Sequence, residues 1–148
     1  MEILKKYKVL LVLTLIVMAG VFFFFYRFYY HDVKALKNFT LSYERFDRAI
    51  SNFSVGETDD LNIKADGALH ELTHAASFRL SSLIKNDGLI PPLALEIADF
   101  SGKELDALRA YKRLGQSKNS DLDRLAKEYG DLASRRKTAY ARFRELAE

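Results

Sequence analysis

The chain has 148 residues, of which 23 are Lys or Arg and 20 are Asp or Glu, and it has no cysteine. This length allows one modest domain, and the lack of cysteine excludes disulfides, thiolate metal ligands and cysteine nucleophiles. The net charge of +3 arises within residues 1–27, which hold four cations and one anion, so residues 28–148 hold 19 of each. A neutral domain has no basic field that attracts a phosphate backbone, so we expect no nucleic-acid partner.

The first predicted element is an apolar anchor over residues 9–30, preceded by a basic tail, residues 1–8. An 18-residue run from Val9 to Tyr26 has no charged side chain. As an α-helix it would span roughly 27 Å, close to the hydrocarbon core of a bilayer at about 30 Å. We predict a signal anchor that crosses the lipid bilayer once, with a cleaved signal peptide or a buried core helix as the alternatives. The apolar and aromatic side chains that we predict to contact the membrane in this anchor are Val9, Leu13, Ile16, Phe22, Phe25, Tyr26 and Tyr29.

The charges beside this run predict its orientation. Lys5, Lys6 and Lys8 precede it, whereas Arg27, Lys34 and Lys37 follow it, which is nearly a tie. A short basic N-terminal tail usually stays in the cytoplasm. We therefore expect a cell-membrane protein with a cytoplasmic N-terminus and a periplasmic or extracellular C-terminal domain.

Apolar side chains at helical spacing continue through residues 31–148, without the alternation that marks strands. Short polar turns divide this part, which predicts an all-α fold whose domain is an antiparallel bundle like a four-helix bundle. The turn after the first helix contains Gly56, which we expect to adopt a left-handed conformation. The expected helices cover about 31–54, 60–85, 92–114 and 120–147.

Two of these helices carry apolar seams with the alternating spacing of three and four that is typical of coiled coils. Such seams favour packing against another membrane or extracytoplasmic protein, or self-association. Arg136 lies on the second seam, where a cation needs a carboxylate partner or a route to solvent. The predicted interaction seam consists of Leu36, Phe39, Tyr43, Phe46, Ile50, Phe53, Leu122, Leu125, Tyr129 and Leu132.

Residues 70–74 read HELTH, which matches the H-E-x-x-H metal-binding pattern. Histidines four positions apart on a helix can share a metal, and the glutamate between them can activate its water. The string ALHELTHA over residues 68–75 resembles the zinc-binding helix of thermolysin-like peptidases. The resemblance implies zinc as cofactor, His70 and His74 as ligands, and Glu71 as general base. The nearest match for that family's third ligand is Glu96.

Helical geometry favours a different role for the same residues. With about 100° per residue, both histidines fall opposite Leu72 and its apolar stripe, which predicts that they face solvent. Our first hypothesis is therefore a membrane-anchored interaction, scaffold or accessory subunit, with no catalytic residue and no cofactor. The alternative is a membrane-anchored zinc hydrolase that uses the HELTH motif.

Overall fold

The computed structural model describes residues 2–56, 59–114 and 121–148, with side chains from Tyr7 onward. These residues form four helices and no strand, which confirms the predicted all-helical class within the described ranges. The helices are α1 (Glu2–Val55), α2 (Asp59–Ala76), α3 (Ile90–Leu114) and α4 (Asp121–Ala147).

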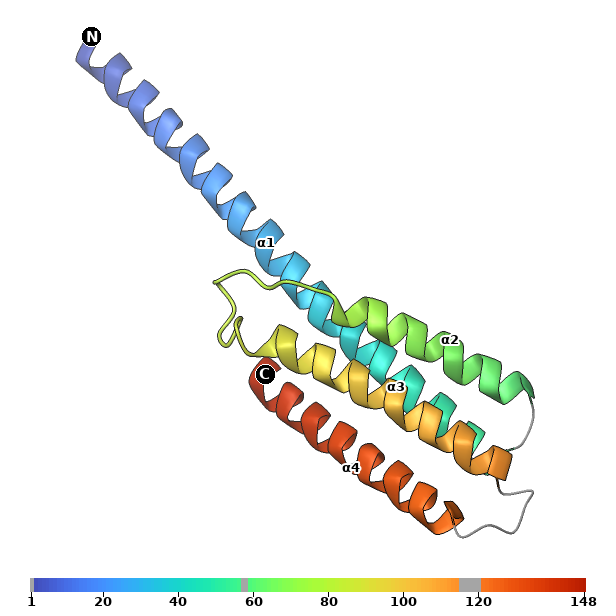
Figure 1. The fold of residues 1–148 in the computed structure, drawn as a ribbon. Helices are drawn as coiled ribbons and strands as arrows, with labels where there is room; N and C mark the ends of the chain where they lie inside the picture. Colours follow the sequence, from blue (N-terminus) through green and yellow to red (C-terminus); the bar gives the residue numbers. More distant parts are fainter. Residues whose placement is uncertain (1, 57–58, 115–120) are drawn as a thin grey trace.

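Helix α1 is long because no Pro or Gly interrupts the sequence from Val21 to Val55. Its N-terminal part extends beyond the other helices, whereas its C-terminal part lies alongside them (Figure 1). Among the described residues, α1 is the one helix long and apolar enough to be a candidate membrane span. Its most apolar window has a mean hydropathy of 2.7, and none of that window is buried.

The C-terminal part of α1 forms one packed unit with the other three helices. Helix α2 contacts both α1 and α3, and α3 contacts α4. Aromatic side chains join α1 to α4, since the ring centroids of Phe39 and Phe143 are 4.6 Å apart and those of Tyr43 and Tyr140 are 3.5 Å apart. The core between them consists mainly of fully buried side chains: Phe39, Phe46, Ile50, Leu72, Ile90, Ile97, Leu105 and Phe143.

The predicted second helix extends to residue 85, whereas α2 ends at Ala76. Long-range contacts to α1 account for the difference. The backbone N–H and the hydroxyl of Ser81 both donate to the Asp32 carboxylate, and the Phe78 ring packs edge-on against Phe39 at 6.1 Å. These contacts hold Phe78 and Ser81 against α1, off the helical path. Leu83, which the helical spacing places on the apolar stripe, is consequently 48% exposed.

The other helix ends agree closely with the sequence pattern. The predicted helices 92–114 and 120–147 correspond to α3 and α4, and the predicted helix 31–54 is the C-terminal part of α1. Pro91 and Pro92 occupy the first turn of α3, where the missing N–H leaves no helical hydrogen bond unmade.

The left-handed conformation expected at Gly56 is wrong. No described glycine has a positive φ, and Gly56 instead donates its N–H to the Asn52 carbonyl at 2.9 Å. A Cβ at this position would lie 2.3 Å from Leu61 Cδ1, so a larger residue would require the Leu61 side chain to shift. The left-handed residue in the described part of the chain is Asn86, with φ of 65°, in the loop before α3.

Candidate functional site

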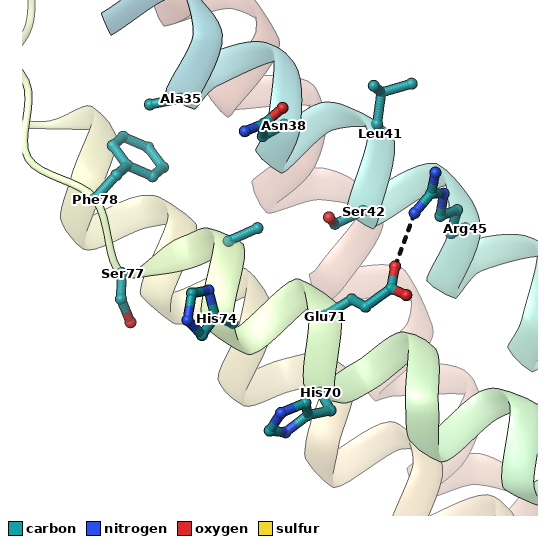
Figure 2. A pocket seen from close by; sticks show the side chains of 11 residues that line it. Ala35, Asn38, Leu41, Ser42, Arg45, His70, Glu71, His74, Ser77 and Phe78 are labelled. Carbon is teal, nitrogen blue, oxygen red and sulfur yellow. Dashed lines mark hydrogen bonds and ion pairs between the residues drawn. The ribbon is translucent and has the colours of Figure 1, made fainter. Parts of the chain in front are cut away.

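An open groove of about 570 Å³ runs between α1 and α2 and is lined by His70, Glu71 and His74 of the HELTH motif (Figure 2). Its α1 wall includes Leu41 and Arg45, and its α2 wall carries both histidines and Glu71. His70 and His74 are exposed, as the position of Leu72 in the core predicted. The motif thus lies in a concave surface, on the solvent side of its helix.

Glu71 is engaged by a cation from the other wall of the groove. Arg45 Nη1 donates to Glu71 Oε2 at 3.0 Å, and Figure 2 shows the carboxylate turned toward α1. The two imidazole rings lie one turn apart along α2 (Figure 2). Since 61% of the Arg45 side chain and 53% of the Glu71 side chain are exposed, solvent and salt screen this ion pair.

The structure does not bring Glu96 to the two histidines. Glu96 lines a different groove, between α3 and α4, in which its neighbours include Arg135 and Arg142. The burial of Leu93 and Ile97 fixes the rotation of α3 and places Glu96 on this side. The alternative ligand set of His70, His74 and Glu96 is therefore divided between two grooves. Within the ranges described, no three His, Asp or Glu side chains are grouped so that they could hold a metal ion.

We expect the purified full-length protein to bind zinc no better than its His70→Ala and His74→Ala variants. Two exposed imidazoles supply only half of a four-coordinate site, and Arg45 competes with a metal for Glu71. Metal analysis after dialysis against zinc measures this, with Glu96→Ala as the control. Stoichiometric zinc that is lost in both histidine variants would contradict the expectation.

The predicted interaction seam lies largely inside the molecule. Phe39, Phe46 and Ile50 are at most 1% exposed, and Leu125 on the second seam is 8% exposed. Phe39, Phe46 and Ile50 belong to the hydrophobic core that the helices of this chain share. Leu36, Leu122, Tyr129 and Leu132 are partly buried. Most of the predicted seam is therefore inside the fold and not on its surface.

A buried cation connects α1, α3 and α4. Arg136 is 1% exposed, and its Nε donates to Glu104 Oε2 at 2.5 Å. Its Nη2 donates to Asp47 Oδ1 at 2.8 Å and to the second Glu104 oxygen at 3.4 Å. The guanidinium also lies over the rings of Tyr43 and Phe46, at 5.1 and 5.3 Å from their centroids. Arg136 therefore has two carboxylate partners, Glu104 and Asp47, where its position on the seam predicted at least one.

Burial dominates the electrostatics of this cluster. It raises the pKa of the Glu104 carboxyl, although the hydrogen bond and the charge of Arg136 lower it in part. Burial lowers the pKa of the Arg136 guanidinium, but the hydrogen bond and the charge of Glu104 raise it, and the net effect is a raised pKa. Burial also raises the pKa of Tyr43 to about 12. Arg136 Nη1 has no hydrogen-bond partner among the described residues, so the guanidinium is bonded through Nε and Nη2 only.

Sequence reasoning found Arg136 but missed its partners. Glu104 follows Ile97 and Ser101 at spacings of seven and three and precedes Leu108 by four, so all four share one face of α3. A glutamate on a helix face whose other members are Ile, Leu and a small serine is a signal for a buried ion pair. Asp47 gives no such signal, because it precedes Arg136 by 89 residues and its side chain is 39% exposed.

Comparisons of the chain with known protein families, with curated proteins and with solved structures find no match.

Proposed function

We propose that the chain is a single-pass membrane protein that acts as an interaction, scaffold or accessory subunit of a membrane complex. Residues 1–8 form a cytoplasmic tail, residues 9–30 form the anchor, and residues 31–148 form an antiparallel four-helix bundle on the outer face of the membrane. The packing of α2 against both α1 and α3, and of α3 against α4, supports this bundle.

One observation carries the proposal, namely the change of environment along α1. In its N-terminal part large apolar side chains face outward, and Phe22 is 75% exposed and Phe25 48% exposed. In its C-terminal part Phe39 and Phe46 are fully buried. Removing apolar surface from water gains about 25 cal/mol per Å², so an outward-facing run of this length favours a lipid environment. The same exposure extends to Val9, Leu13, Ile16, Tyr26 and Tyr29.

The groove between α1 and α2 supports the interaction role. It presents exposed Leu41 beside charged Arg45 and Glu71, a mixture that suits a protein surface. The partner is another membrane or extracytoplasmic protein, or a second copy of the chain. The zinc hydrolase stays as the second candidate, because both imidazoles are accessible and one turn apart.

Site-specific photo-crosslinking in native membranes tests the interaction role. A photoreactive amino acid replaces His74 in the groove, and the matched control replaces exposed Lys127 on α4. We expect a discrete adduct, with another protein or with a second copy, from the His74 position and not from the Lys127 position. No adduct from His74, together with a lone monomer in mild detergent, would contradict the proposal.

A further inference from the structure

A second pocket of about 570 Å³ lies where the apolar part of α1 meets the loop before α3. Helix α1 contributes Phe24, Arg27, Phe28 and His31, which recur on one face of the helix at spacings of three, one and three. The loop contributes Arg79, together with Leu80 and Ser81. Two segments distant in sequence therefore build the pocket at one level along α1.

The two arginines of this pocket have no internal partner. No hydrogen bond or ion pair joins Arg27 or Arg79 to any described residue, and both side chains are exposed. The carboxylate of the pocket belongs to Asp32, which is 5% exposed and accepts hydrogen bonds from the Ser81 backbone N–H and hydroxyl. That carboxylate is turned to the loop backbone, so two free guanidinium groups dominate the charge of the pocket.

The walls beside the arginines are apolar. The rings of Phe24 and Phe28 pack together with centroids 4.4 Å apart, and Leu80 lies on the loop side. Two cations next to an aromatic wall suit a ligand with an anionic head and an apolar tail. A guanidinium binds phosphate through paired hydrogen bonds, which makes arginine the preferred side chain for this task.

We propose that this pocket binds the headgroup phosphate of an anionic phospholipid, with Arg27 and Arg79 as the donors. The inference rests on the proposed membrane anchor, because the uncharged run ends at Tyr26 and the next residue, Arg27, is then at the depth of the headgroups. A lipid held between α1 and the loop fixes the bundle against the membrane surface. Leu83 and Leu89 of the same loop are also exposed.

The experiment reconstitutes the full-length protein into nanodiscs of phosphatidylcholine alone or mixed with phosphatidylglycerol. Native mass spectrometry then measures which lipids stay bound after release into mild detergent. We expect retention of phosphatidylglycerol over phosphatidylcholine, reduced about fivefold by Arg79→Gln, since each arginine near a membrane surface contributes about that factor. Arg27→Gln is expected to act in the same direction. Arg113→Gln, an exposed arginine in the last turn of α3, is the matched control and should change nothing.

The outcomes separate this site from the anchor. Insertion into both nanodiscs without a preference for the anionic lipid, or with equal loss in Arg113→Gln, overturns the site and leaves the anchor intact. Failure to insert into either nanodisc overturns both. An added arm titrates inorganic phosphate onto the protein in a neutral detergent. Phosphate binding that needs Arg79, without retention of phosphatidylglycerol, overturns the lipid as the source of the anion.

Discussion

Replacing Glu104 with alanine should lower the free energy of unfolding by about 3–5 kcal/mol, because it leaves a buried guanidinium without its main partner. Arg136 is 1% exposed and has two of its hydrogen bonds to Glu104. In the variant the only carboxylate left beside Arg136 is that of Asp47, which accepts one hydrogen bond, from Nη2. The loss is a large share of the stability of an ordinary domain, which is about 5–15 kcal/mol. Urea unfolding of the full-length protein in mild detergent, followed by circular dichroism, measures it.

Two further variants test the cause of this effect. Lys103→Ala removes the charged side chain next to Glu104 in the sequence. Its ion pair with Asp99 is more than half exposed, so the free energy of unfolding should fall by at most about 1 kcal/mol. The double variant Glu104→Leu with Arg136→Met removes both buried charges and should be more stable than Glu104→Ala, since no uncompensated cation remains. A double variant less stable than Glu104→Ala would show that packing volume, and not the unpaired charge, causes the loss.

Two lysines in the apolar part of α1 should release the protein from membranes. Leu13→Lys combined with Val17→Lys places two charges one turn apart within the 18-residue run, with Val17 at its middle. Each lysine at the centre of a span costs about 2.5–3.5 kcal/mol, against a gain of about 0.3–0.6 kcal/mol from each Leu, Ile, Phe or Val. The two lysines therefore offset most of the gain from the whole run. Carbonate extraction of membranes followed by immunoblotting measures the change.

The matched control adds the same charge outside the proposed anchor. Val55 is 90% exposed and Ile63 is 68% exposed, so Val55→Lys with Ile63→Lys should leave both the fold and the membrane fraction unchanged. Retention of the Leu13 and Val17 variant in the carbonate-resistant fraction would contradict the proposed anchor. Equal release of both double variants would show that added charge alone, wherever it lies, extracts the protein.

The helices follow from local sequence patterns, whereas the loop before α3 does not. The seam from Phe39 to Phe53 is continuous at spacings of three and four, and the structure buries it as a core. By their helical spacing alone, Leu80 and Leu83 continue the apolar stripe of α2. The helix nevertheless ends before them, because the Asp32–Ser81 hydrogen bonds connect residues 49 positions apart and leave no local trace. Tertiary contacts overrode the local preference at this point.

The candidate site shows the same division between local and long-range information. The four-residue spacing of His70 and His74 predicted their shared exposed face, because that relation is internal to one helix. Glu96 matches the third-ligand pattern of the resembled family by its residue type and setting, but the rotation of α3 about its own axis decides which groove it enters. Arg136 indicated that a carboxylate must be near, but no local pattern identifies Asp47, which is 89 residues away.

The central claim is that α1 crosses the membrane and holds the helical domain on its outer face. The cysteine-free chain allows this to be measured with single cysteines at Lys5, Leu13 and Lys127 and a membrane-impermeant maleimide. In intact spheroplasts we expect Lys127→Cys to react, Lys5→Cys to react only after permeabilisation, and Leu13→Cys to stay unlabelled in both conditions. Labelling of Leu13→Cys as fast as Lys127→Cys would contradict the span, and labelling of Lys127→Cys only after permeabilisation would reverse the orientation.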